Sequence, residues 1–393
     1  MSEIKTKQRA VAALESTLIQ HLRLHEGTSR IELARMMDLA PSTIGLYVDR
    51  LIEDGFLLEG QKSRRSAGRP PTILELNPDA GQFVGVDFEA RQLSATAVDF
   101  SQQTLGRQKQ TIRATDTPDR VIEKIKSAVS DVAGPMPRLL GIGIAVPGSV
   151  DPKRGVALHY EFIRDWRDVP LVKHLVREFN VPVYLENNMR AMALAERWFG
   201  QARDVDNFVC VGVRSGIGAG VMVNGQLHRG RNNLAGEIGG WFCLPETGPL
   251  KDTVTLEKLA STRAILHQLT EAALAGQKTA LVVRRGRLVT LEEMLRAARG
   301  GDRLVLEVLQ GTARVLGRAI SQFTLLLNPE QVIIAGPLAE LGNLFLEPMR
   351  DVVESLMPAL HAKAPRIVAS QLGEYGGALG AAAMAVHQWK PAR

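Results

Sequence analysis

The sequence predicts an α/β protein that begins with a winged helix-turn-helix, over residues 1–80, and continues as a duplicated, two-lobed α/β domain, over residues 81–393. Two observations lead to this expectation. Helix-spaced apolar residues and then two strand-like segments fill the first part, whereas strands and helices alternate through the rest. In addition, a strand, a tight turn and a strand occur twice, as "QFVGVDFEARQLSATAVDF" and as "NFVCVGVRSGIGAGVMVNGQL", so the second part has two related halves.

Bulk composition favours a packed protein of two or three domains in a reducing compartment. The chain has 393 residues, of which 45% are hydrophobic, and this is ample for buried cores. No run of about eighteen apolar residues occurs, and the first residues lack the apolar stretch of a signal peptide, so we expect a cytoplasmic protein with no membrane partner. Two cysteines make no disulfide framework. The net charge of +6 fits a polyanionic partner and, equally, an ordinary basic protein.

Three helices are predicted at the N-terminus. Apolar residues recur at helical spacing over residues 7–26, in "RIELARMMDL" and in "PSTIGLYVDRLIEDG". Ser29 can cap the second helix, and Pro41 suits the start of the third, where a missing N–H is harmless. Two short helices around a tight turn indicate a helix-turn-helix, whose second helix lies in the DNA major groove. We expect the outer face of that helix to contact DNA through Ser42, Thr43, Tyr47 and Arg50.

A basic loop between two predicted strands completes the DNA-binding head. "FLLEG" and "PTILELNP" are expected to form a β-wing, with "QKSRRSAGRPP" between them. That loop contains no acidic residue and four basic ones, namely Lys62, Arg64, Arg65 and Arg69. Such a loop suits phosphate contact or insertion into the minor groove. The plainer alternative is a three-helix unit with a merely solvated loop, but the order of the elements favours double-stranded DNA as a partner.

A polar junction follows a buried strand in the second part. "VPVYLEN" is a predicted strand and "MRAMALAERWFG" a predicted helix, with Glu186, Asn187 and Asn188 where they meet. Polar side chains at the carboxyl end of a strand usually face a ligand crevice in α/β proteins. Elsewhere the pattern predicts an amphipathic helix over residues 118–133, a buried strand in "LLGIGIAV" and a tightly packing, small-residue helix in "GGALGAAAMAVHQW".

Taken in order, a series of short segments resembles one known family. They are "SRIELARMMDLAPSTIGLYVDRL", "GRPP", "GVDF…AVDF", "GIAVPGSVD", "ENN", "SGIGAGVMVNGQLHRG", "LAGEIG", "LEKLAS", "LNPEQVIIAG" and "GALGAAAMA", and they cover nearly the whole chain. The family is ROK (repressors, open reading frames and sugar kinases), in particular its sugar-responsive repressors of the xylose-repressor and N-acetylglucosamine-repressor kind. The resemblance implies an actin-like, sugar-kinase-like fold with a cleft between two lobes, and a transcriptional regulator that represses carbohydrate-uptake or catabolic genes.

Against the family's kinases, the residues needed for phosphoryl transfer are altered. The first phosphate cradle of the family is Asp-x-Gly-Gly-Thr-Lys, and here the stretch is "DFEARQ", which places Glu89 and side-chain-bearing Ala90 where glycines let the backbone approach phosphate. The family's catalytic base is an aspartate, and here Asn188 stands in its place, whose amide cannot take up a hydroxyl proton. We therefore expect no enzyme activity. The second cradle, "RSGIGAG", keeps its glycines and either binds an anion or only forms a tight hairpin.

The resemblance also implies a sugar site. Its residues here are Asn187, Asn188, Glu237 and Glu257. The family's histidine after the first glutamate has become Gly240 and an upstream asparagine has become Phe162, so we expect an altered pocket for a small carbohydrate-like effector, or else a vestigial cleft. Two alternatives stay open: a sugar kinase with a regulatory DNA-binding head, and a DNA-binding regulator that responds to no ligand.

The family's structural zinc site is expected to be lost. Its ligands are that histidine and three closely spaced cysteines, whereas this loop contains only Cys243, and a tetrahedral site needs four ligands. We therefore predict no metal and no other cofactor, and we expect Trp241 and Phe242 to pack inward and order the loop instead. A homo-oligomer, dimer or tetramer, is expected because two DNA-reading heads on a symmetric assembly can span two half-sites.

Overall fold

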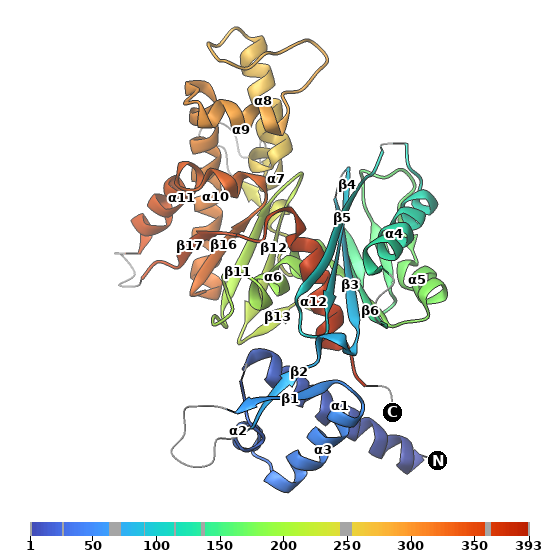
Figure 1. Ribbon diagram of the computed structural model, residues 1–393. Helices are drawn as coiled ribbons and strands as arrows, with labels where there is room; N and C mark the ends of the chain where they lie inside the picture. The colour runs from blue at the N-terminus through green and yellow to red at the C-terminus, as the bar shows by residue number, and fades with distance from the viewer. Residues whose placement is uncertain are drawn as a thin grey trace.

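The computed structural model describes residues 2–25, 27–62, 72–89, 91–113, 115–134, 138–243, 254–357 and 363–391 (Figure 1). Three arginines of the predicted basic loop, Arg64, Arg65 and Arg69, lie outside the described residues, as do the side chain of Lys62 and the whole of Ala90. The corresponding predictions stay predictions.

The N-terminal head consists of three helices and a two-stranded antiparallel sheet. The elements are α1 (Ser2–Leu24), α2 (Arg30–Met36), α3 (Pro41–Glu53), β1 (Leu57–Lys62) and β2 (Thr72–Leu76). Ser29 begins α2 with a capping box, because its hydroxyl accepts from the Glu32 backbone N–H while the Glu32 carboxylate accepts from the Ser29 backbone N–H. The helices and strands predicted for this part of the chain are therefore confirmed.

Two five-stranded sheets form the cores of two lobes and share one strand order. The first has the order β10-β6-β3-β4-β5 and the second β13-β12-β11-β16-β17. The strands are β3 (Gln82–Glu89), β4 (Gln92–Asp99), β5 (Thr104–Thr111), β6 (Leu139–Val146) and β10 (Val183–Asn187), and then β11 (Phe208–Val213), β12 (Ile217–Val223), β13 (Gln226–His228), β16 (Gln331–Ala335) and β17 (Arg366–Ala369). In each sheet three strands form an antiparallel meander and two further strands add in parallel. The predicted duplication is therefore confirmed.

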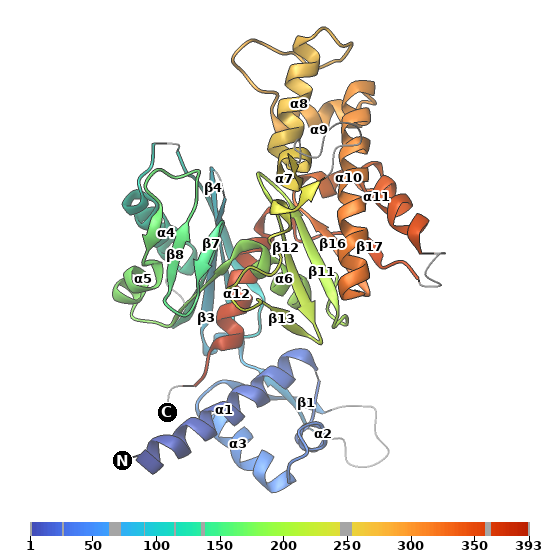
Figure 2. The ribbon, with the colours of Figure 1, turned by 180° about the vertical axis from the view of Figure 1, so that it is seen from behind.

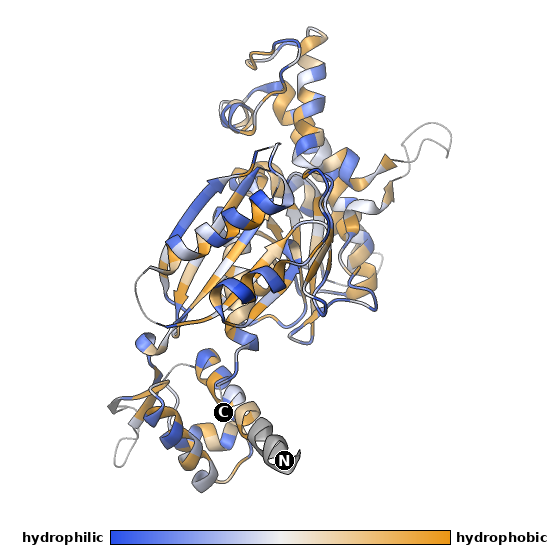
Figure 3. Cartoon of the chain, turned by 90° about the vertical axis from the view of Figure 1, so that its right-hand side faces the viewer, coloured by the Kyte–Doolittle hydropathy of each residue, from blue (hydrophilic) through white to orange (hydrophobic). Residues whose placement is uncertain are grey.

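Helices cover these sheets or, over residues 262–299, pack on other helices. They are α4 (Pro118–Ala133), α5 (Leu171–Phe179), α6 (Asn188–Trp198), α7 (Leu256–Ala260), α8 (Thr262–Leu274), α9 (Leu291–Arg299), α10 (Arg303–Leu327), α11 (Asn343–Leu356) and α12 (Gly376–Gln388). Short strands form two small separate sheets, one of β7 (Ser149–Asp151), β8 (Val156–His159) and β9 (Arg167–Val169), the other of β14 (Phe242–Cys243) and β15 (Val254–Thr255). Apolar residues line the interior strands and polar ones the outer helix faces (Figure 3). Within the described chain, no helix combines the length and the apolar character that crossing a bilayer requires.

Helix α12 lies between the two lobes and consists mainly of glycine and alanine (Figures 1 and 2). It packs against α6 on one side and against β3 and β6 on the other. Gly380 shows why small residues are needed, since a Cβ there would lie only 1.8 Å from the Ala191 carbonyl oxygen in α6. The predicted tight packing of this segment is thus confirmed, and α12 and α6 meet backbone to backbone.

The head rests on the C-terminal end of α12, and one apolar core runs through both. Trp389 packs edge-on against Phe56 of the head, at 5.0 Å between ring centroids, and against Phe100 of the first lobe, at 5.4 Å. Side chains of α1 donate to backbone carbonyls at the end of α12, from Gln20 to His387 at 2.9 Å and from Arg23 to Val386 at 3.2 Å. The last carbonyls of a helix have no partner within it, so α1 provides the partners that α12 lacks. Apolar packing therefore crosses the expected division near residue 80.

Candidate functional site

A cavity of about 260 Å³ opens between the two lobes. Its described walls comprise Glu89, Pro147, Gly148, Ser149, His159, Tyr160, Glu161, Phe162, Asn187, Asn188 and Met189 from the first half, and Arg214, Ser215, Gly216, Ile217, Gly218, Ala219, Gly236, Glu237 and Glu257 from the second. The structure thus brings together all four residues predicted to bind a sugar, namely Asn187, Asn188, Glu237 and Glu257. Their role in binding remains a prediction.

The two asparagines of the pair differ in what their side chains do. Asn187 caps α6: its Oδ1 accepts from the Met189 backbone N–H at 2.9 Å, while its Nδ2 donates to the Gly148 carbonyl at 3.0 Å. The Asn187 side chain is therefore already used to accept hydrogen bonds from the backbone N–H groups at the start of α6. The Asn188 side chain lines the cavity and has no hydrogen-bond partner within the described part of the chain. Of the pair, Asn188 is the amide that is available to a ligand.

The two glutamates lie on the second lobe. Glu257, in α7, accepts from the Ile217 backbone N–H at 2.9 Å, which fixes the start of β12 beside the cavity. Glu237 also lines the cavity, and part of its side chain is accessible to solvent. Surrounding protein desolvates the Glu237 carboxylate and raises its pKa, Arg190 opposes this shift, and the nearby Glu257 adds to it. Two carboxylates and one amide on a concave wall can accept and donate hydrogen bonds to hydroxyl groups.

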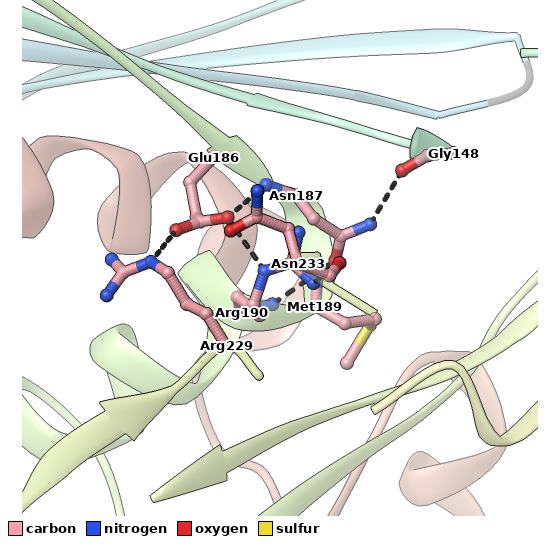
Figure 4. A network of polar contacts seen from close by, with 7 residues as sticks. All are labelled: Gly148, Glu186, Asn187, Met189, Arg190, Arg229 and Asn233. Atoms are coloured by element: carbon pink, nitrogen blue, oxygen red, sulfur yellow. Dashed lines mark hydrogen bonds and ion pairs between the residues drawn. The ribbon is translucent and has the colours of Figure 1, made fainter. Parts of the chain in front are cut away.

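Glu186 does not face the cavity, contrary to the expectation for the polar junction. It is fully buried, and its Oε1 pairs with Arg190 Nε at 2.7 Å while its Oε2 pairs with Arg229 Nε at 2.7 Å (Figure 4). Arg190 also donates to the Asn233 carbonyl of the second lobe at 2.9 Å. The only sequence signal for this network is the short separation of Glu186 and Arg190, four residues apart across the junction of β10 and α6. The network joins the junction of β10 and α6 to the second lobe.

A second set of ion pairs crosses the cleft at the positions of the family's two phosphate cradles. Arg214, in the turn between β11 and β12, pairs with Asp87 at 3.2 Å and with Glu89, both at the end of β3. Glu89 Oε1 also accepts from the Ser215 backbone N–H at 2.9 Å. The second cradle therefore already holds a carboxylate from the opposite lobe. Burial raises the pKa of Asp87, partly offset by Arg214, and the Glu89 charge adds to the rise.

On the head, the residues predicted to contact DNA from the outer face of α3 are less exposed to solvent than expected. Ser42 is exposed, whereas Thr43, Tyr47 and Arg50 are half-buried. The Arg50 guanidinium lies 5.7 Å from the Tyr47 ring centroid and 3.5 Å from the buried Glu15 carboxylate of α1. Sequence reasoning missed Leu46, whose side chain is 58% exposed on this face. Apolar contact with a thymine methyl is one use that DNA-reading helices make of such a residue.

The loop that would carry zinc lacks the ligands for it. Gly240 offers no side chain, residues 244–253 contain no cysteine or histidine, and no three metal-ligating side chains cluster among the described residues. The residues present therefore do not fit a tetrahedral zinc site. Trp241 packs against Phe323 of α10, at 6.4 Å between ring centroids, in line with the expectation. The same expectation was wrong for Phe242, which is 75% exposed because β14 turns its side chain outward.

The fold and the cleft define a class of protein. A model of the ROK family matches residues 83–388, and the chain belongs to this family. The matched region contains both lobes and begins after the head. The mixed α/β architecture, with two sheets of the same strand order facing a common cleft, is the actin-like fold of the family.

Individual relatives differ in how much of this chain they match. The xylose repressor of Caldicellulosiruptor bescii is 27% identical over 370 residues, which are 91% of each chain. A crystal structure of a ROK family transcriptional regulator, described as a homologue of the E. coli MLC protein, superposes with a TM-score of 0.81 at 25% identity, over 96% of this chain and 97% of that one. The glucokinase of Thermotoga maritima is 31% identical over 310 residues, or 77% of this chain and 96% of the glucokinase. The repressor and the regulator thus match this chain nearly end to end, and the kinase does not.

Proposed function

We propose that this chain is a DNA-binding transcriptional repressor of carbohydrate-uptake or catabolic genes, controlled by a sugar or sugar derivative in the interlobe cleft. The observation that carries this proposal is the path from cleft to head. Asn188, at the start of α6, lines the cavity, α6 packs on α12 through the close contact at Gly380, and α12 ends against α1 of the head. The relatives named repressor or regulator match over nearly the whole chain, head included.

In this proposal the ligand acts by favouring one lobe arrangement over another. A ligand can shift that equilibrium only by binding the two arrangements with different affinity. Because the cleft walls come from both lobes, a bound sugar that contacts both favours the arrangement in which they are close. Helix α12 lies between the lobes and carries the head, so the spacing of two heads in a homodimer or tetramer changes with lobe angle.

The head is proposed to read DNA as a winged helix-turn-helix. Helices α2 and α3 provide the two-helix unit, and β1 and β2 provide the wing. Exposed Ser42 and Leu46 lie where α3 would enter the major groove, and the basic residues between β1 and β2 would contact phosphates.

Arg69→Ala is expected to weaken DNA binding and to flatten its salt dependence, because each lost phosphate contact reduces the slope of log K against log salt by about one. The measurement is fluorescence anisotropy of a labelled duplex at several salt concentrations. Arg164→Ala is the matched control, since Arg164 lies in the loop between β8 and β9 with an 89% exposed side chain. Equal affinity and slope for the Arg69 variant and wild type would argue against a DNA-contacting wing.

We propose further that the cleft does not phosphorylate its ligand. A kinase requires a general base at the sugar hydroxyl and a cradle for phosphate. Asn188 supplies an amide at the base position, and the cradle groups around Ser215 already bind Glu89. The alternative, a sugar kinase with a regulatory head, draws support from the glucokinase match.

Asn188→Asp separates these views. The variant is expected to show no ATP-dependent turnover of glucose, xylose or N-acetylglucosamine, because a restored carboxylate leaves the cradle occupied by Glu89. A coupled assay for ADP release measures this, with wild type alongside. Turnover by wild type would overturn the proposal, whereas turnover by the variant alone would show that the base was the one missing part.

The effector claim is tested by thermal shift against a panel of unmodified sugars. A ligand that binds only the folded state raises Tm by mass action. At least one sugar is expected to raise Tm in a saturable way, and Asn188→Ala is expected to reduce that rise. If no sugar in a broad panel stabilises the protein while DNA binding is intact, the chain is a regulator that responds to no such ligand.

A further inference from the structure

Three donors in the cleft converge on one carboxylate. The Ser215 backbone N–H donates to Glu89 Oε1 at 2.9 Å, the Ser215 hydroxyl donates to the same oxygen, and Arg214 Nε pairs with Glu89 Oε2. A backbone N–H, a hydroxyl and a guanidinium together form a good anion-binding site, because each is a donor and one carries a full positive charge. Here the anion is part of the same chain and comes from the opposite lobe.

Nearby groups hold this arrangement in place. Arg214 also pairs with Asp87 at 3.2 Å, and the Arg214 carbonyl accepts from the Thr262 backbone N–H at 2.9 Å. Glu89 and Arg214 have side chains only 13% and 19% exposed, so solvent screens their attraction weakly. The Glu89 carboxylate is therefore a fixed part of the cleft wall that ties the two lobes together.

The remaining charge in the cavity has the same sign as Glu89. Of the described cavity residues, the acidic ones are Glu89, Glu161, Glu237 and Glu257; the basic side chains are Arg214, already paired, and the imidazole of His159. A ligand that carries phosphate or carboxylate would meet this negative field and would have to displace Glu89 to reach the donors. An uncharged polyhydroxy ligand meets neither obstacle and can hydrogen-bond to Asn188, Glu237 and Glu257.

We propose that Glu89 is a built-in anion that fills an anion site and thereby restricts the cleft to uncharged, unphosphorylated sugars. This inference rests on the proposed function in assuming that the cleft binds a sugar. It goes beyond the proposed function by naming the class of ligand and the residue that determines that class. The two ligand classes would also have opposite effects on the lobes. An uncharged sugar that contacts both lobes favours the arrangement in which they are close, whereas an anion that displaced Glu89 would break the contact between Glu89 and Ser215 that joins them.

The first test asks whether removing Glu89 exposes an anion site. Glu89→Ala is expected to gain saturable stabilisation by inorganic phosphate, with an apparent Kd at least tenfold below that of wild type. Thermal shift over a phosphate series measures this, with chloride added to hold ionic strength constant. Glu161→Ala is the matched control, since it removes the same charge from the same cavity without freeing the Ser215 donors.

Each outcome of this test decides the role of Glu89. A gain by Glu89→Ala alone supports it. Equal gains by both variants would show a general charge effect, and phosphate binding by wild type as tight as by Glu89→Ala would show that Glu89 blocks nothing; either result overturns the inference. Should Glu89→Ala fail to fold, Glu89→Gln against Glu161→Gln repeats the comparison with side-chain size preserved.

The second test addresses ligand class in the full-length wild-type protein. Glucose and N-acetylglucosamine are each compared with their 6-phosphates by thermal shift. Where either member of such a pair binds, the uncharged sugar is expected to bind at least tenfold more tightly than its 6-phosphate. Glu89→Ala is expected to reduce the ratio between the affinities for the uncharged sugar and for its 6-phosphate. Tighter binding of a 6-phosphate by wild type would overturn the inference and leave the repressor proposal standing. If none of the sugars binds, the effector proposal fails, and the phosphate series still decides what Glu89 does.

Discussion

Glu186→Ala is expected to lower the free energy of unfolding by about 3–5 kcal/mol, the range found when one partner of a buried ion pair is removed. Glu186 and Arg190 are each only 1% exposed, and Arg190 would keep its charge in the protein interior with the Asn233 carbonyl as its remaining hydrogen-bond acceptor among the described residues. The Asn187 backbone N–H would lose its acceptor as well. Urea denaturation followed by circular dichroism measures the effect.

Arg229→Ala is the control for this prediction. It removes the other partner of Glu186, but its side chain is 38% exposed, so we expect a loss of less than about 1 kcal/mol. Equal losses for the two variants would show that burial of the Glu186–Arg190 pair does not set the stability of this junction. A larger loss for Arg229→Ala would contradict the account of the network directly.

Trp389→Ala is expected to produce the second large effect, a loss of about 3–5 kcal/mol together with a weaker response of DNA binding to sugar. The first part follows from deleting a buried aromatic side chain, which here packs against Phe56, Phe83 and Phe100. The second follows because Trp389 joins α12 to the head. Denaturant unfolding measures stability, and anisotropy with and without sugar measures the response.

Phe242→Ala is the matched aromatic control, since Phe242 is 75% exposed and far from this contact along the chain. We expect it to change stability by no more than about 0.5 kcal/mol and to leave the sugar response intact. If Trp389→Ala lowers stability while DNA binding still responds fully to sugar, the head receives its signal by a route other than the end of α12.

Much of the fold follows from local patterns. The helix over residues 118–133 was predicted at the bounds that α4 has. In the structure, five buried apolar residues and a capping Thr117 define it within one segment. The paired hairpins likewise appear as repeated alternation, and their strand order repeats in the structure. Interactions between residues close together in the sequence determine such elements, and a pattern in the sequence therefore predicts them.

The functional contacts were harder to predict because they join distant parts of the chain. Glu89 meets Ser215 across 126 positions, and Ser16 of α1 meets Trp389 across 373. Glu89 could be recognised as the wrong residue for a phosphate cradle, yet nothing local indicated that it would bind the other cradle. Asn187 was correctly placed at the cleft, but its capping hydrogen bonds depend on where α6 begins.

The measurement that tests the central claim most directly is the affinity of the full-length protein for DNA with and without a bound sugar. The duplex is one selected by the protein itself from a random-sequence pool, and the sugar is one that raises Tm. We predict that saturating sugar weakens DNA binding by about tenfold or more and, since linkage is reciprocal, that DNA weakens sugar binding by the same factor. An affinity for DNA that is unchanged at saturating sugar would contradict the claim that the cleft controls the head.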